Sequence, residues 1–362
     1  MPLVPRHIRD LPIYQPGQSI EEVRRELGLN RIIKLTSNEN PYGASPKALE
    51  AVKNTLSDNF RYPDAMAYSL REKLSKRFDV KVKNVVVGAG SEGIISFIMR
   101  TFLRHGDEII AAANSFIGFR IIAQATPNHT NWVKMNNYHH DLPAMAEQIN
   151  EYTKIIYFAN PDNPTGTYFS TDVFDSFMQR VPEQVLIILD EAYFEYAQYM
   201  ADYPDSMHYR YDNVITLRTF SKAHGLAGFR IGYGFAHEDL IENLNKVKLP
   251  FEPSGPAQVA AVAALDDTSY IKKTVELCHE EMKTLKKVFH NENIEVIPSS
   301  ANFLTLVFED EEKAESFNKS MLHRGVILRG LSAWGHPNCI RITVGTKEEN
   351  MYLIECMSKE LS

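Results

Sequence analysis

The sequence predicts an α/β fold, in which a large three-layer α/β/α domain with a mostly parallel sheet precedes a smaller α+β domain. Between about residues 45 and 250, short apolar runs rich in β-branched residues alternate with amphipathic stretches. Fully apolar strands are typical of parallel sheets that are covered on both faces. After residue 256 the pattern changes to a long helical stretch followed by shorter strands and helices. A length of 362 residues suits about two domains.

The elements are predicted in order from these patterns. An N-terminal arm is expected over residues 1–30, the large domain over 31–250 and the small domain over 251–362. The apolar runs predict strands of the large domain at 85–87, 108–111, 155–158, 185–189 and 214–217. In the small domain we expect a helical stretch at about 257–290, strands at 294–297, 303–307 and 339–344, a helix near 311–324 and a last helix.

Composition limits the partners of this chain. The formal net charge is −7, and the basic residues are dispersed, so no nucleic acid partner is expected. The three cysteines, Cys278, Cys339 and Cys356, have no CxxC spacing, so neither disulfides nor a metal site is predicted. No segment has the length and apolarity of a membrane span. We therefore expect a cytoplasmic protein that binds small molecules and copies of itself.

Candidate functional residues follow the predicted strands, because ligands of open α/β sheets bind at the carboxyl ends of the strands. The first strand is followed by Gly88-Ala89-Gly90-Ser91-Glu92-Gly93 and then an apolar helical run. Backbone N–H groups at such a helix start bind anions such as phosphate. The alternative is a glycine turn that serves only packing.

Three further strand ends carry polar groups. Asn163 lies in a turn stiffened by two X-Pro steps, Asp190 is followed three residues later by Tyr193, and Lys222 precedes Arg230 by eight residues. Each has a simpler interpretation: a surface turn, a helix N-cap and a solvated lysine.

Together and in this order, these motifs resemble the fold-type I pyridoxal 5′-phosphate (PLP)-dependent aminotransferases, most closely the histidinol-phosphate aminotransferase family. The resemblance covers essentially the whole chain. It is carried by the segments SNENPYG at 37–43, RYPD at 61–64, NPTG at 163–166, DEAY at 190–193, Ser221-Lys222 and IRITVG at 340–345. Each segment is a weak signal, but the ordered set is specific.

The resemblance implies roles around the cofactor ring. Lys222 is expected to bind PLP covalently through its amine and to transfer the Cα proton of the substrate. Asp190 would face the ring nitrogen and keep it protonated. Tyr193 and Asn163 would hydrogen-bond the phenolic oxygen, and Phe116 would stack on the ring, unless it is only a core residue.

The cofactor phosphate has its own expected partners. They are the backbone of Gly90 and Ser91, the side chains of Ser221 and Thr219, and the fork of Arg230. Tyr62 is expected to reach the phosphate in the neighbouring subunit, which implies a homodimer. The family usually has Asp where this chain has Ser91, so any role of that side chain is in doubt here.

Substrate groups are expected to meet three residues. Arg341 matches the arginine that binds the α-carboxylate of glutamate, and Arg329 matches the one for a distal anion. Tyr14 matches a tyrosine on an arm that closes over the substrate, although it could simply pack on the surface. Trp334 and His336 lie between the two arginines and receive no role.

The predicted activity is transamination of histidinol phosphate with 2-oxoglutarate, which yields imidazole-acetol phosphate and glutamate in histidine biosynthesis. An aromatic amino acid aminotransferase is the first alternative, and a PLP-dependent amino acid phosphate decarboxylase is the second. A non-catalytic module of a transcription regulator is disfavoured, because the first 30 residues are too short and proline-rich for a helix-turn-helix domain.

Overall fold

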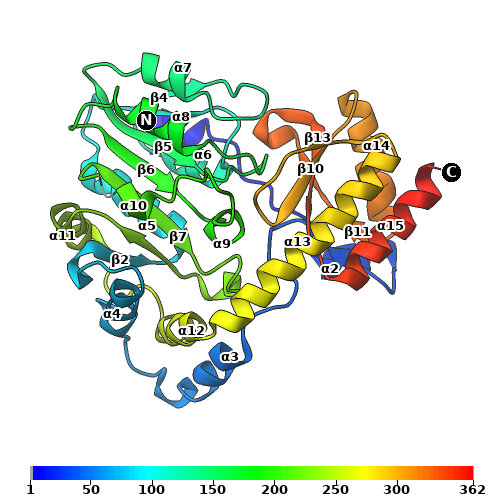
Figure 1. Cartoon of the computed structure of the whole chain (residues 1–362), viewed down its shortest axis with the longest axis horizontal. Helices are drawn as coiled ribbons and strands as arrows, with labels where there is room; N and C mark the ends of the chain where they lie inside the picture. Colours follow the sequence, from blue (N-terminus) through cyan, green and yellow to red (C-terminus); the bar gives the residue numbers. More distant parts are fainter. Residues whose placement is uncertain (1–2, 210, 362) are drawn as a thin grey trace.

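A seven-stranded sheet forms the centre of the larger part of the computed structural model, which describes residues 3–209 and 211–361. The strand order is β2-β8-β7-β6-β5-β3-β4, and only β8 is antiparallel to its neighbours (Figure 1). The predicted α/β class is thereby confirmed. The strands are β2 Val85–Gly88, β3 Glu108–Ala112, β4 His129–Val133, β5 Thr153–Ala159, β6 Leu186–Asp190, β7 Val214–Thr219 and β8 Gly232–Phe235.

Helices cover both faces of this sheet because its strands are apolar on both faces. On β5, Ile155 and Tyr157 join a core with the helices of one face, whereas Ile156 and Phe158 join a core with those of the other. The first face carries α5 Gly90–Phe102, α6 Ile117–Gln124 and α11 Glu238–Val247. The second carries α7 Leu142–Glu147 and α8 Thr171–Met178. This is the expected three-layer arrangement.

Two strands of the sheet were not predicted. The edge strand β4 has the sequence HTNWV and is only partly buried, so it lacks an apolar run. The sequence of β8 is GYGF, and glycine is a poor strand former. The glycines of β8 are needed for close approach: a Cβ on Gly232 would lie 2.7 Å from the backbone of Gly90 and Ser91.

The smaller part is built on a four-stranded antiparallel sheet of order β12-β13-β10-β9. Its core also receives the long helix α13, which runs toward this sheet from the larger part (Figure 1). The elements are α13 Thr268–Asn291, β9 Glu295–Ile297, β10 Phe303–Val307, α14 Glu311–His323, β12 Arg329–Leu331, β13 His336–Thr343 and α15 Lys347–Leu361.

The observed helices and strands differ in three places from the predicted elements and domain boundaries. The helical stretch expected at about 257–290 is two helices, α12 Gly255–Asp266 and α13, which meet at Asp267. Helix α12 packs with β2, β8, α3 Pro46–Lys53 and α4 Tyr68–Arg77 of the larger part. Strand β1, Ile33–Lys34, pairs in parallel with β11, Val326–Ile327, so this segment joins the smaller part. The division into domains remains a prediction.

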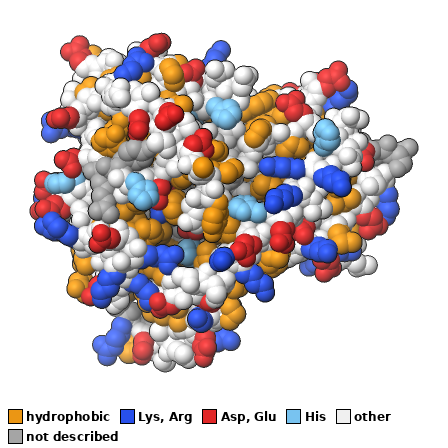
Figure 2. All heavy atoms as spheres, viewed as in Figure 1, with side chains coloured by type: hydrophobic (Ala, Val, Ile, Leu, Met, Phe, Trp, Pro, Cys, Tyr) orange, Lys and Arg blue, Asp and Glu red, His pale blue; other side chains and the backbone are white. Residues whose placement is uncertain are grey.

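The remaining elements are short. They are α1 Arg6–Arg9, α2 Ile20–Leu27, α9 Phe194–Ala197, α10 Ser206–Tyr209 and the 3-10 turns Leu56–Asp58, Val82–Asn84, Ala227–Phe229 and Ser332–Trp334. Acidic and basic side chains are interspersed over the face drawn in Figure 2. No helix within residues 3–209 or 211–361 is both long and apolar enough to span a bilayer.

Candidate active site

A cavity of about 250 Å³ lies where strands β2, β5, β6 and β7 end. It is the place at which parallel α/β sheets bind ligands. Most of the predicted cofactor residues meet there, although they come from segments far apart in the sequence. Those that line it are Gly90, Ser91, Phe116, Asn163, Asp190, Tyr193, Thr219, Ser221, Lys222 and Arg230.

Asp190 is buried at the floor of this cavity. The alternation of β6 turns Asp190 toward the same face as Leu186 and Ile188, the face that α5 covers. Tyr157 donates a hydrogen bond of 3.2 Å to Asp190 Oδ2, whereas Oδ1 has no hydrogen-bond partner among the described residues. Burial raises the pKa of Asp190 to about 7. A buried, half-satisfied carboxylate fits the protonated ring nitrogen of PLP, which would supply the missing donor and the opposite charge.

Lys222 lines the cavity a short distance beyond the end of β7. Its Nζ donates to the carbonyl of Ser37 at 3.1 Å, and it lies 5.7 Å from the ring centre of Tyr193. Burial, and then the nearby charge of Arg341, lower the pKa of Lys222 to about 8. The amine is therefore far more available as a nucleophile near neutral pH than an exposed lysine.

A hydrogen-bond network holds the polar groups across the cavity. Asn38 donates to the hydroxyl of Tyr193 at 2.8 Å, and burial raises the pKa of Tyr193 to about 12. Arg341 donates to Asn163 Oδ1 and, at 2.6 Å, to the carbonyl of Thr36. Burial lowers the pKa of Arg341 to about 10, so it still carries a positive charge at neutral pH.

The start of α5 and the turn after β7 form a cradle suited to phosphate. Gly90, the first residue of α5, has φ +77°, and a Cβ there would lie 2.9 Å from Arg230 Nη2. Thr219 donates to Ser221 Oγ at 3.0 Å, and Arg230 Nη1 donates to the same atom at 3.4 Å. Helix-start N–H groups, two hydroxyls and a guanidinium thus face one space, which fits the phosphate of PLP.

The predicted substrate residues line an adjoining cavity. Tyr14, Arg329 and Arg341 border it together with Lys222 and Phe116, which border the first cavity as well. Arg329 donates to the carbonyl of Gln15 at 2.9 Å and lies 5.7 Å from the ring centre of Tyr14. The N-terminal arm therefore lies against the expected substrate position.

Tyr62 is the one predicted cofactor residue outside this set. It is 80% exposed and stacks on Phe251 with ring centres 4.3 Å apart. It lines neither cavity. Its expected contact with a neighbouring subunit remains a prediction.

Sequence reasoning missed several residues that support the site. Tyr157 bonds Asp190, and Ser37 supplies the carbonyl for Lys222. Asp162 is fully buried, accepts hydrogen bonds from Ser115 and Thr165, and so joins the loop that carries Phe116 to the one that carries Asn163. The only sequence signal for Asp162 and Ser37 was their place in or beside the quoted motifs.

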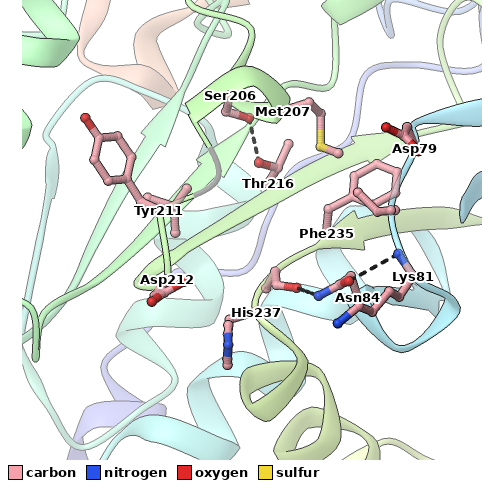
Figure 3. Close-up of a pocket in the computed structure, with 13 residues that line it drawn as sticks. Asp79, Lys81, Asn84, Ser206, Met207, Tyr211, Asp212, Thr216, Phe235 and His237 are labelled. Atoms are coloured by element: carbon pink, nitrogen blue, oxygen red, sulfur yellow. Dashed lines mark hydrogen bonds between the residues drawn. The ribbon is translucent and has the colours of Figure 1, made fainter.

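A larger cavity, of about 450 Å³, lies elsewhere, against the start of β7 and the end of β8 (Figure 3). None of the predicted site residues lines it. Its polar groups Ser206 and Thr216 are bonded to each other, and Asn84 is bonded to backbone groups. The predicted cofactor-binding residues therefore lie at the smaller cavity.

Comparison with protein-family models identifies the family of this chain. The model of the family "Aminotransferase class I and II" matches residues 30–356. The chain belongs to this family. Aminotransferase, the expected enzyme class, is thereby confirmed.

Sequence relatives show to which group of aminotransferases the chain is similar. It is 43% identical to a histidinol-phosphate aminotransferase of Geobacillus sp. (strain WCH70), over 98% of this chain and 97% of the relative. It is 42% identical to one of Halalkalibacterium halodurans, over 94% and 92%. The predicted membership in the histidinol-phosphate aminotransferase family is thus confirmed.

Solved structures agree on the fold. A histidinol-phosphate aminotransferase of Sinorhizobium meliloti, in complex with pyridoxal-5′-phosphate, superposes with a TM-score of 0.91 at 26% identity, covering 100% of this chain and 98% of that one. An aspartate aminotransferase of Thermotoga maritima, at 20% identity over 99% and 100% of the two chains, superposes with a TM-score of 0.84 and shares the fold.

Proposed function

We propose that this aminotransferase uses PLP to transfer the amino group of histidinol phosphate to 2-oxoglutarate, giving imidazole-acetol phosphate and glutamate in histidine biosynthesis. The names of its relatives support the substrate. The observation that carries the proposal is that Arg329 and Arg341 border a cavity that Lys222 also borders. Two cationic forks beside a reactive amine suit anionic amino donors and acceptors.

PLP, when bound, supplies the electron sink that stabilises negative charge on the substrate Cα. Asp190, whose Oδ1 has no hydrogen-bond partner among the described residues, would hold the ring nitrogen and stabilise its positive charge. Lys222 Nζ would hold the cofactor covalently, and its amine would be the group that takes up the proton from the substrate Cα. Tyr193 and Asn163 hydrogen-bond the phenolic oxygen, and Phe116 packs on the ring.

Anion binding divides among three groups of residues. The α5 start, Thr219, Ser221 and Arg230 hold the cofactor phosphate, so the ring cannot leave during a turnover. Arg341 binds the α-carboxylate of glutamate, and Arg329 binds the distal anion of either substrate. Tyr14 covers the substrate from the arm and excludes water.

We also propose a cytoplasmic homodimer in which Tyr62 serves the neighbouring cofactor phosphate. Exposed apolar side chains are frequent in the segment around Tyr62, and Tyr62 stacks on the exposed Phe251, which supports an interface there. We call these side chains the 56–68 patch, which comprises Leu56, Phe60, Tyr62, Met66 and Tyr68 with Leu249 and Phe251.

A half-reaction tests the substrate. Purified holoenzyme is mixed separately with histidinol phosphate, glutamate and phenylalanine, and the loss of the visible cofactor band is followed. Histidinol phosphate should bleach the band fastest at the lowest concentration. A tenfold advantage for phenylalanine in rate over concentration, about 1.4 kcal/mol, would instead identify an aromatic amino acid aminotransferase. Release of carbon dioxide from an amino acid phosphate would identify a decarboxylase.

A further inference from the structure

Trp334 lies between the two substrate arginines. It is 2% exposed and lines the same cavity as Arg329 and Arg341. Its ring centre is 5.0 Å from the guanidinium carbon of Arg329 and 5.7 Å from that of Arg341. Both distances are within the range of cation–π attraction, and tryptophan is the aromatic side chain that binds cations best.

The partners of the two guanidinium groups are neutral. Arg329 donates to the carbonyl of Gln15, and Arg341 donates to the carbonyl of Thr36 and to Asn163. Within the described part of the chain, neither forms an ion pair with a carboxylate. Two like charges are thus held near each other without a carboxylate in direct contact, although the charge of Arg329 disfavours that of Arg341 and the buried Asp162 favours it.

An indole face can stabilise two neighbouring arginines without occupying the N–H donors that the substrate needs, whereas a carboxylate would occupy them. A carboxylate between the arginines would neutralise them and compete with the substrate for their N–H donors. The indole face attracts the cations electrostatically but accepts none of those hydrogen bonds in the plane of the forks. It therefore keeps both guanidinium groups charged, separated and free to bind anions.

Contacts from both parts of the molecule hold the segment that carries this ring. Asn114 donates to the carbonyl of Trp334 at 2.6 Å, and Arg120 donates to that of Ala333 at 3.1 Å. The next residue, Gly335, has φ +84°, and a Cβ there would lie 2.4 Å from Asn114 Nδ2. Leu331 packs on the ring from the smaller part.

We propose that Trp334 is a specificity-determining residue for the glutamate and 2-oxoglutarate half-reaction. It spaces Arg329 and Arg341 so that, among carboxylic acids, the site favours those with a second carboxylate at the distal end over those with one. The ligand class is a five-carbon dicarboxylate, the class to which 2-oxoglutarate and glutamate belong. This inference rests on the proposed function, since that function requires a dicarboxylate acceptor.

Two unreactive acids of equal chain length test the proposal. Glutarate has a carboxylate at each end, and pentanoate has one. Their dissociation constants are measured from the change they cause in the visible band of the holoenzyme, for the unsubstituted chain and for Trp334→Leu and Trp334→Phe. Trp334→Leu should lower the preference for glutarate over pentanoate about tenfold, and Trp334→Phe should lower it less than about threefold, because phenylalanine retains an aromatic face.

Equal losses for both acids, or an unchanged preference in Trp334→Leu, would overturn the proposal, since a residue with only a packing role would not discriminate between the acids. Trp132→Phe is the matched control, because Trp132 is the other tryptophan of the chain and lines neither cavity. It should leave the preference unchanged. Variants are compared only where the thermal midpoint and cofactor band match those of the unsubstituted holoenzyme; if Trp334→Leu does not fold, Trp334→Met takes its place.

Trp132→Phe also provides a second readout, since Trp334 is then the single tryptophan of the chain. Glutarate should change its emission, because its carboxylates bind the guanidinium groups that lie against the ring face. Unchanged emission at saturating glutarate would contradict the proposal. These binding measurements use no reaction, so a failure of histidinol phosphate turnover would reject the proposed function and leave the role of Trp334 to be judged separately.

Discussion

Burial perturbs the two central ionisable groups of this site in opposite directions. It raises the pKa of Asp190 to about 7 and lowers that of Lys222 to about 8. Both shifts have the same cause, because a low-dielectric surrounding disfavours whichever form is charged. A substantial fraction of Lys222 is therefore neutral near physiological pH. The carboxyl group of Asp190 would be ionised more readily with a cation beside it.

The pKa of Lys222 can be tested on the apoenzyme. Only the neutral amine reacts with an acylating reagent, so the rate of modification at Lys222 should rise with pH to a midpoint of about 8. Mass spectrometry of the Lys222 peptide measures that rate, with the exposed Lys53 as an internal reference. Because the charge of Arg341 contributes to the shift, Arg341→Met should move the midpoint upward. A midpoint near the ordinary value of 10.5 would show that the amine is solvated.

Asp190→Asn should stabilise the apoenzyme while it destroys cofactor binding. The folded-state pKa of Asp190 lies above its ordinary value, so its contribution to stability is present at low pH and is lost as the pH rises through about 7. Asparagine stays neutral and avoids this loss, which amounts to about 4 kcal/mol at most. The free energy of unfolding of the apoenzyme should therefore increase most at pH 8, by a smaller amount at pH 5, where the unfolded carboxylate is already ionised, and little below the ordinary pKa of 3.8. PLP affinity should fall at least about 100-fold. Equal stability of the two apoenzymes at pH 8 would contradict the assigned pKa.

The start of helix α5 shows how one element creates an anion site. Its first residue has a positive φ, and the strand β8 approaches it closely through Gly232. The N–H groups of the first turn lack intrahelical partners, as at any helix start, and Gly90, Ser91 and Arg230 line the same cavity. If backbone donors provide the binding, the side chain of Ser91 should matter little.

A pair of substitutions separates backbone from side chain at this helix start. Gly90→Ala strains a residue at φ +77° and places a Cβ 2.9 Å from Arg230 Nη2, so the dissociation constant for PLP should rise about tenfold or more. Ser91→Ala keeps every backbone donor, and the constant should rise less than about threefold. Titration of each apoenzyme with PLP, followed by absorbance, measures both constants. A loss in Ser91→Ala as large as in Gly90→Ala would assign the binding to the hydroxyl.

At the scale of the whole molecule, the cavity and the 56–68 patch are separate features. The cavity holds Lys222, whereas Tyr62 is exposed and stacked on Phe251. A two-fold dimer places the same patch of each subunit against its partner. In such a dimer each site would take Lys222 from one subunit and Tyr62 from the other.

Subunit mixing tests this arrangement. Lys222→Ala and Tyr62→Ala chains should each be impaired alone, whereas a mixed dimer should contain one site with both native residues. After equal mixing and exchange, activity should rise to about a quarter of the unsubstituted level, measured as steady-state transamination. Activity no higher than the mean of the two separate variants would place Tyr62 and Lys222 in sites of the same subunit, or in a monomer. Mixing Lys222→Ala with Asp190→Asn is the control, because both residues line one cavity and no native site can form.

Much of this organisation could be predicted from the sequence. Apolar runs located β2, β3, β5, β6 and β7, since a strand buried on both faces must be apolar throughout. The residues after those runs are the ones that line the cavity, because parallel strands end at one edge of the sheet. The strands β4 and β8 were missed because polarity at an edge and glycine in a strand give no periodic signal.

Local pattern thus determined the fold class and the polar residues at the strand ends, because alternation and turn chemistry depend on neighbours in the chain. The remaining candidates, such as Arg329 and Arg341, followed from the resemblance to a family. Only the tertiary structure decided which distant groups meet. It brought Asn38 to Tyr193 and Arg341 to Asn163, across 155 and 178 residues. It also packed α12 with the larger part and placed Trp334 between Arg329 and Arg341. Such pairings arise from the burial of whole surfaces and the close approach of backbones, which no local stretch of sequence records.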